Sequence, residues 1–295
     1  MMEALDLGEI QGPLLVFGGP YGNLQATEAL LAEAARLGIP PKNMLCSGDL
    51  VAYCGDPKAT VALIRAAGIP VVMGNCEEQL GSGAEDCGCG YAEGSSCDLM
   101  AAQWYRYASE QLDAETKTWM ARLPRRILLT LDGPGNGPGS KLRLAAIHGG
   151  LDLINRFVFP ATPAAEKAEQ LALAGGDGVI GGHSGLPFSE IVSNHLWHNA
   201  GVIGLPANDG TPRVWYALLR PGPQGLEIEH RPLAYDHAAA AAAIRAADLP
   251  AAYAETLESG LWPADDVMPE ADRKRRGRAI APAKLVFTRD AEAVA

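Results

Sequence analysis

Residues 44–49, Met-Leu-Cys-Ser-Gly-Asp, join a short apolar run to a turn that ends in a carboxylate. Three later segments repeat this plan, since apolar runs lead into Gly74-Asn75, His148-Gly149 and Gly182-His183. Short apolar runs that alternate with helical patterns are typical of a parallel sheet, and open α/β sheets bind ligands at the carboxyl ends of their strands. The adjacent glycines allow sharp turns and leave room for a ligand. We therefore expect one site at such an edge, built from Asp49, Asn75, His148 and His183.

The side chains of this set indicate a metal site. One carboxylate, one amide and two imidazoles are oxygen and nitrogen donors that suit Mn, Fe, Zn or Ni and need no thiolate. A single Gly-Asp or His-Gly pair is usually an ordinary turn. Four such pairs in this order, each after an expected strand, are much more specific, and they predict one bound divalent metal.

On these motifs, and on Asn199-Ala200-Gly201-Val202, the chain from about Leu14 to Leu219 resembles the calcineurin-like metallophosphoesterase superfamily. The resemblance implies a four-layer α/β/β/α sandwich that holds two metals, binds a phosphate ester and activates a water. It also implies that Asp49, Asn75, His148 and His183 are the ligands of one of the two metals.

The ligands of the other metal are missing. The family's first motif, Asp-x-His-Gly-Asn, is matched by Gly-Pro-Tyr-Gly-Asn at residues 19–23, and its last motif, Gly-His-x-His, by Gly-His-Ser-Gly at residues 182–185. The resemblance places three lost ligands at Gly19, Tyr21 and Gly185. Because one ligand set is complete and the other is absent, we expect a single-metal site.

Further residues receive roles from this resemblance. Asp49 and Asn23 are expected to orient a metal-bound water, and Arg156 either grips the phosphate or forms a surface ion pair. Tyr21 either contacts phosphate or metal through its hydroxyl or fills the space of the lost histidine. Cys76 stands where the family has a leaving-group histidine, and the alternative for it is a small buried hydrophobic residue. The other residues expected near the site are Glu77, His198 and Asn199, with a structural role as the alternative for His198.

Four cysteines form a separate candidate cluster. Cys87, Cys89 and Cys97 lie close in sequence, and Cys54 is available from another loop. They are compatible with a four-thiolate metal or redox site, with a disulfide, or with inert loop cysteines.

Composition narrows the class of protein. Among 295 residues, 24 Lys and Arg face 35 Asp and Glu, so the formal net charge is −11, and 48% of residues are hydrophobic. This composition excludes wholesale disorder and argues against binding along a nucleic-acid backbone. No apolar run approaches the length of a membrane span, and the first ten residues lack the pattern of a secretion signal. We expect a cytoplasmic protein that acts on a small phosphorylated substrate and binds neither nucleic-acid polymers nor membranes.

Along the chain, we expect a metallophosphoesterase-like domain over 1–235 and a helical and irregular appendage over 236–295 that packs on it. Strands are expected at 14–17, 44–46 and 69–73, a loop from 81 to 97, and hairpin tips at 132–140 and 221–225. The function predicted is a single-metal phosphoesterase-like hydrolase for a small phosphate ester or nucleotide. The alternatives are a catalytically silent relative that binds metal or a phosphate ligand, and a cysteine-based redox or metal sensor.

Overall fold

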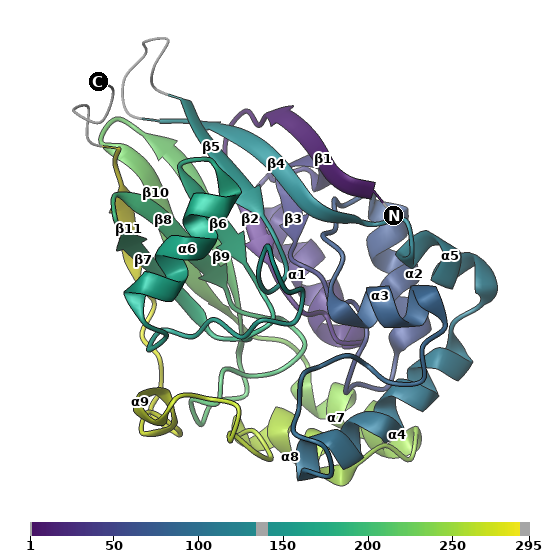
Figure 1. Cartoon of the computed structure of the whole chain (residues 1–295). Helices are drawn as coiled ribbons and strands as arrows, with labels where there is room; N and C mark the ends of the chain where they lie inside the picture. Colours follow the sequence, from purple (N-terminus) through teal and green to yellow (C-terminus); the bar gives the residue numbers. More distant parts are fainter. Residues whose placement is uncertain (1, 134–140, 290–295) are drawn as a thin grey trace.

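Two β-sheets pack face to face, with helices on both outer sides, in the computed structural model (Figure 1). The model describes residues 2–133 and 141–289. One sheet has six strands in the order β1-β4-β5-β6-β8-β7, and the other has five in the order β11-β10-β9-β2-β3. This arrangement confirms the expected four-layer α/β/β/α sandwich.

The strands of the described residues are β1 (Met2–Glu9), β2 (Leu14–Phe17), β3 (Met44–Cys46), β4 (Pro124–Asp132), β5 (Lys141–Ala146), β6 (Gly178–Gly181), β7 (Pro187–Val192), β8 (His195–Ala200), β9 (Val214–Gly222), β10 (Gly225–Leu233) and β11 (Lys284–Phe287). The helices are α1 (Leu24–Arg36), α2 (Pro57–Ala67), α3 (Asn75–Ser82), α4 (Ser96–Gln111), α5 (Ala114–Met120), α6 (Ala164–Ala174), α7 (His237–Ala246), α8 (Ala251–Ser259) and α9 (Glu270–Arg273).

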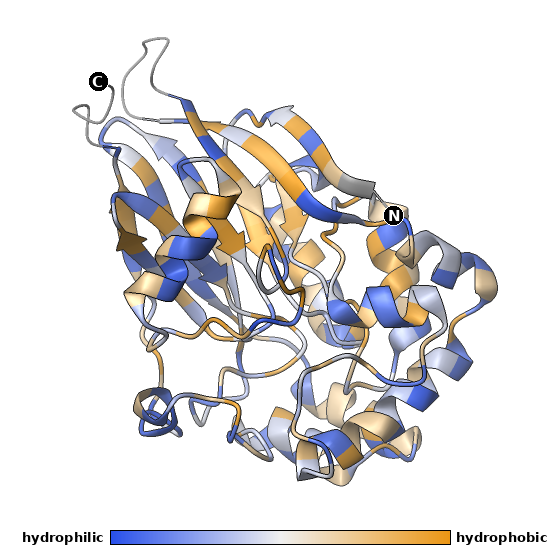
Figure 2. Ribbon diagram, in the orientation of Figure 1, coloured by the Kyte–Doolittle hydropathy of each residue, from blue (hydrophilic) through white to orange (hydrophobic). Residues whose placement is uncertain are grey.

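Strand β2 shows why the layers form. Its side chains alternate between two cores, as the period of two along a strand requires. Leu14 and Val16 face the apolar layer between the sheets, whereas Leu15 and Phe17 face the helices. On the far side, α6 covers the six-stranded sheet through Leu171. Hydrophobic residues accordingly colour much of the strands in Figure 2.

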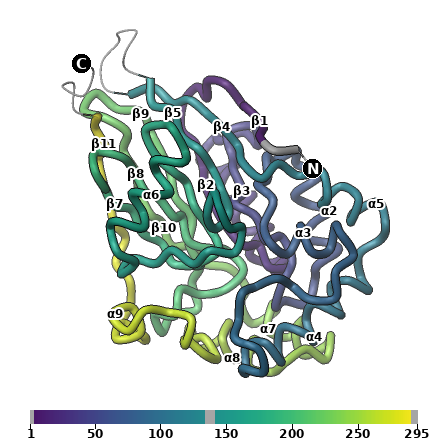
Figure 3. Tube along the Cα trace, viewed as in Figure 1, coloured from purple at the N-terminus to yellow at the C-terminus, as the bar shows by residue number. Residues whose placement is uncertain are grey.

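The segment after residue 235 enters the core at two places. Helices α7 and α8 place Ile244 and Leu257 in the apolar layer beneath the five-stranded sheet. Strand β11 pairs antiparallel with β10 and buries Phe287 between the sheets. Figure 3 shows the path between them, from α8 past α9 to β11 at the sheet edge.

Several expected elements differ from the structure. The run at 69–73 forms a single bridge, between Val71 and Cys46, instead of a strand, and Pro70 has no N–H to extend the pairing. The expected loop from 81 begins within α3 and ends where α4 starts at Ser96. The turn at 221–225 joins β9 to β10 as expected, whereas most of the tip at 132–140 lies outside the described residues. None of the helices in the described ranges has the length and apolarity needed to cross a membrane.

Candidate metal centre

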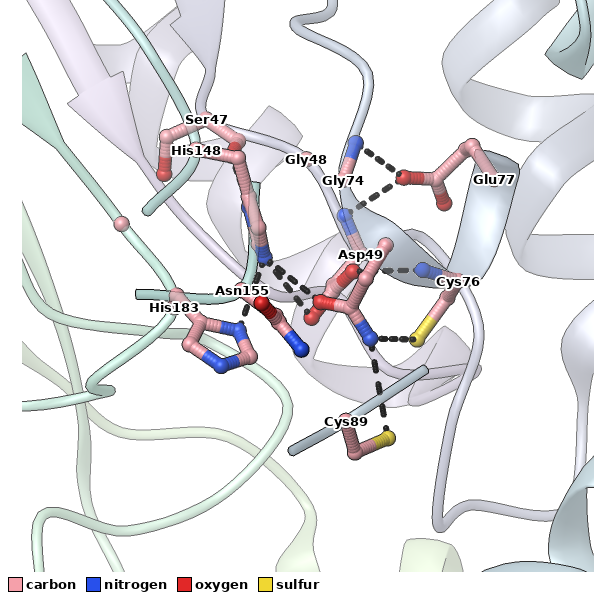
Figure 4. A network of polar contacts seen from close by, with 12 residues as sticks. Ser47, Gly48, Asp49, Gly74, Cys76, Glu77, Cys89, His148, Asn155 and His183 are labelled. Carbon is pink, nitrogen blue, oxygen red and sulfur yellow. Dashed lines mark hydrogen bonds and ion pairs between the residues drawn. The ribbon is translucent and has the colours of Figure 1, made fainter. Parts of the chain in front are cut away.

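Loops from both sheets bring three of the predicted ligands, Asp49, His148 and His183, to one point (Figure 4). Asp49 follows β3 of the five-stranded sheet, His148 and His183 follow β5 and β6 of the six-stranded sheet, and Asn75 begins α3. Ligand atoms of Asp49, His148 and His183 all lie within 4.8 Å of one another. The amide of Asn75 completes the group, because its Oδ1 lies 3.1 Å from Nε2 of His148.

The spacing of these atoms fits a bound cation. Nε2 of His148 lies 3.2 Å from Oδ2 of Asp49 and 3.0 Å from Nδ1 of His183. Donor atoms about 2.0–2.1 Å from one metal ion are about 2.8–3.0 Å apart in octahedral geometry and about 3.3–3.4 Å apart in tetrahedral geometry, and the observed distances lie within the interval between them. The donor set and its spacing therefore fit a divalent ion held by these four residues.

Hydrogen bonds turn the donor atoms toward this point. Nδ1 of His148 donates to the Ser47 carbonyl at 2.7 Å, which leaves the lone pair on Nε2 for a metal. Nδ2 of Asn75 donates to the Cys87 carbonyl at 2.8 Å, which directs its Oδ1 to the same place. Nε2 of His183 is buried and has no hydrogen-bond partner among the described residues.

The backbone is strained where the site is built. Tyr21, Asp49 and His183 have φ angles of 52°, 58° and 57°, in the left-handed region that non-glycine residues seldom adopt. Strain of this kind gathers at functional sites, where the surrounding contacts enforce it. Two of these three residues are metal-ligand candidates, and the third lies beside them.

The charges of the ligands depend on one another. Burial alone would lower the pKa of His148, but the Asp49 carboxylate and the Ser47 carbonyl outweigh it and hold that pKa above its usual value. Burial would raise the pKa of Asp49, yet His148 and His183 keep it below its usual value. Burial and the nearby His148 lower the pKa of His183 to about 3. Near neutral pH, Asp49 is therefore ionised and His183 is neutral.

Glu77 ties two of the ligand loops together. Its carboxylate accepts the N–H groups of Asp49 at 2.8 Å, Leu50 at 2.7 Å and Gly74 at 2.9 Å. Burial and the neighbouring Asp49 raise the pKa of Glu77 to about 7. From the sequence, Glu77 is expected near the site but has no assigned role. Glu77 stands three residues after the N-cap Gly74 and accepts its N–H, which is the glutamate half of a capping box, and a glutamate at this helix position is the sequence signal for that role.

Asn199 supports the loop of His183, and His198 does not. Nδ2 of Asn199 donates to the Gly182 carbonyl at 2.9 Å and to Oγ of Ser184 at 3.0 Å. His198 is fully buried and contacts Oγ of Ser189 at 2.8 Å. The position of His198 therefore fits the structural role that was its alternative.

Two residues expected to act in catalysis have other partners. Oδ1 of Asn23 caps α1 by accepting the N–H of Ala26, and its Nδ2 donates to the Gly204 carbonyl. Arg156 forms a two-bond ion pair with Asp152, at 3.0 and 2.6 Å. This is the surface ion pair named as the alternative for Arg156.

The structure does not assemble a four-cysteine site. Cys87 and Cys89 are joined in a disulfide, which removes both as thiolate ligands. Cys54 and Cys97 are free thiols, and Sγ of Cys54 donates to the Gly204 carbonyl. Cys76 is buried beside Asn75, where burial and the charge of Asp49 raise its pKa well above the usual value.

Solved structures share this fold. The metallophosphoesterase from Sphaerobacter thermophilus is 22% identical, with a TM-score of 0.63 over 84% of this chain and 99% of that one. A hypothetical protein from Pyrococcus horikoshii is 16% identical, with a TM-score of 0.68 over 85% of this chain and 99% of that one. No protein-family model matches the sequence, and a search of curated proteins finds no match. The chain therefore has the calcineurin-like metallophosphoesterase fold that its motifs indicate.

Proposed function

We propose that this chain is a single-metal phosphoesterase-like hydrolase that acts on a small phosphate ester. The observation that carries the proposal is the convergence of Asp49, Asn75, His148 and His183, with donor atoms at metal-ligand spacing. A divalent ion bound there would polarise a phosphate oxygen and lower the pKa of a bound water. The net charge of −11 favours a small substrate over a nucleic-acid polymer, and a cytoplasmic location remains a prediction.

The residues around the ion have distinct tasks. Asp49 supplies the only negative charge among the four ligands, so it contributes most to cation binding. His148, held by Ser47, and Asn75, held by the Cys87 carbonyl, present preoriented neutral donors. Glu77 keeps the Asp49 and Gly74 loops at a fixed separation through its three hydrogen bonds. Rigid support of this kind keeps ligands in place without cost at the moment of binding.

The proposal is tested on the stripped and reloaded protein. Chelated protein is loaded in turn with Mn, Fe, Zn and Ni, and its metal content and its turnover of phosphomonoesters and phosphodiesters are measured on the same sample. We expect Asp49→Asn to lose metal and turnover together. Glu258→Gln is the matched control, because it removes an exposed carboxylate that pairs with Arg245 far along the chain. Turnover retained in Asp49→Asn would overturn the proposal.

A second candidate is a silent relative that binds metal or a phosphate ligand without hydrolysis. Cys76 favours it, since a buried thiol whose pKa is raised is a poor acid for a leaving group at neutral pH. Stoichiometric metal binding with no turnover by any loaded form would support this candidate. The cysteine-based sensor has less support, because two of its four cysteines are already paired with each other.

A further inference from the structure

Beside the metal centre, aromatic side chains occupy the positions of the missing ligands. The ring of Tyr21 lies against the backbone of Gly19, where an added Cβ would stand 2.7 and 2.8 Å from Cε1 and Cε2 of that ring. At Gly185 an added Cβ would lie 3.5 Å from Cζ2 of Trp262. Residue 19 therefore has no room for a side chain, and an indole from the C-terminal segment covers residue 185.

These side chains line a partly open cavity of about 70 Å³. Its aromatic wall includes Tyr21, Tyr53, Tyr91, Phe157, Tyr253 and Trp262. Several polar tips of this wall are engaged elsewhere. The hydroxyls of Tyr53 and Tyr91 lie 2.9 Å apart and bond to each other, and Nε1 of Trp262 donates to the Pro206 carbonyl at 2.7 Å. These three residues therefore line the space with their ring faces and edges.

His183 is shared by the cavity and the metal centre. This residue lines the cavity, and the ring of Phe157 lies over its imidazole at a centroid distance of 4.3 Å. Its Nδ1 faces His148 on the metal side. The cavity and the metal centre therefore lie on two sides of the same imidazole, and of the four ligand candidates only His183 lines the cavity.

The lining lacks the charges that a phosphate requires. None of the described residues around this cavity is Lys, Arg, Asp or Glu. Burying an anionic oxygen against ring faces without a donor or a cation is costly, whereas burying a hydrocarbon group there is favourable. The charged end of a ligand belongs at the metal, and an uncharged end belongs in the cavity.

We propose that this cavity binds the short uncharged hydrocarbon group of a substrate whose phosphoryl group sits at the metal centre. The inference rests on the proposed function and specifies its substrate class. The cavity has about half the volume of the 150 Å³ cavity that holds benzene, so it takes roughly three carbon atoms. It therefore selects an ester with a short alkyl group over a nucleotide, whose base is larger.

The C-terminal segment gains a role from this inference. Tyr253 of α8 and Trp262, which follows it, form the side of the cavity that the first half of the chain does not supply. Trp262 is held in place by its bonds to Pro206 and Asn208. The segment after residue 235 thus completes the substrate pocket.

The test measures the binding of straight-chain alkylphosphonates, from methyl to hexyl, to the metal-loaded protein by calorimetry. These probes are not hydrolysed, so binding is read without turnover. We expect affinity to rise about fourfold per methylene up to propyl, since each buried methylene adds that much, and then to stop rising. Equal affinity for every chain length, or a rise that continues to hexyl, would overturn the inference.

Two variants locate the effect. Trp262→Ala removes one wall of the cavity and is expected to weaken the rise in affinity with chain length. Ala264→Leu fills the cavity from a partly exposed loop position, and it is expected to bring the limit from propyl down to methyl. Trp119→Ala, on α5 away from the lining, is the control and should keep the profile of the native chain. A profile unchanged in Ala264→Leu would place the alkyl group elsewhere.

Failure of this inference differs from failure of the proposed function. A chain-length limit without hydrolysis of any ester would retain the cavity and reject the hydrolase. Hydrolysis with a flat chain-length profile would retain the hydrolase and reject the cavity as its substrate pocket.

Discussion

The metal centre and the aromatic cavity beside it, called here the polar half and the aromatic half, stand at the ends of the same sheets but have opposite chemistry. In the polar half, Asp49, Asn75, His148 and His183 point their donor atoms at one place. In the aromatic half, a ring lies against Gly19 and an indole covers Gly185. A ligand set lost by drift would leave a hole or a random filling. The ring of Tyr21 leaves no room for a side chain at residue 19, so aromatic rings stand where the resemblance places metal ligands.

The largest effect is expected from emptying the aromatic half. Tyr21 is buried and its ring packs edge-on against Tyr53 at a centroid distance of 4.9 Å. Tyr21→Ala should therefore lower the free energy of unfolding by about 3–5 kcal/mol, as loss of a large buried aromatic side chain does. Urea unfolding measures this change. Tyr21→Phe keeps the ring and should cost less than about 1 kcal/mol, and a small loss in Tyr21→Ala would contradict the filling role.

Metal binding in the polar half should raise the free energy of unfolding, by less than Tyr21→Ala lowers it. At a free metal concentration of about 100 times Kd, the native chain should gain about 2.7 kcal/mol of unfolding free energy, and a chelator should remove it. Asp49→Asn should show no gain under the same conditions. If Asp49→Asn were stabilised as much as the native chain, the metal would bind elsewhere.

Loss of the Glu77 hydrogen bonds that support the ligand loops should have a smaller effect, and it should act on metal affinity. Glu77→Gln loses acceptor capacity for the N–H groups of Asp49, Leu50 and Gly74. We expect the metal Kd to rise about 10–100-fold, which is typical of groups that orient ligands. Glu78→Gln is the control, since that neighbouring carboxylate pairs with Arg125 instead. Equal effects in the two variants would mean that Glu77 has no positioning role.

Of the four ligands, only His148 should release a proton when the metal binds, and Glu77, whose pKa is about 7, is the nearby group that would add a second. In the metal-free chain the pKa of His148 lies above its usual value. At a pH below that pKa, His148 is protonated and must release its proton before it can bind the metal. Asp49, whose pKa is lowered, and His183, whose pKa is about 3, are already deprotonated near neutral pH. Affinity should thus fall about tenfold per pH unit below the pKa of His148 and be flat above it. Calorimetry at several pH values measures the slope, and a hundredfold change per unit would show that two protons are displaced.

The polar half was predictable because its signals are local. Each ligand follows an apolar run within a few residues, so strand ends could be found without knowing the topology. The capping position of Glu77 was visible too, but its contact with the Asp49 loop joins residues 28 positions apart and needs the fold.

The aromatic half could not be predicted in the same way. Tyr21 was expected near the site, and filling of the vacated space was one of its alternatives. Trp262 carries no local signal, because it reaches Gly185 only after the chain has passed through β7 to β10 and two more helices. The edge strands β1 and β11 were missed for a similar reason, since each is defined by one neighbour that lies far away in sequence.

The central claim is that the polar half holds a metal and the aromatic half does not. The direct measurement is the metal content of the reloaded and desalted chain, by elemental analysis with protein concentration determined on the same sample. The account predicts about one divalent ion per chain, and none in Asp49→Asn. Two tightly bound ions per chain, about 3.5–4 Å apart as in two-metal sites, would contradict it.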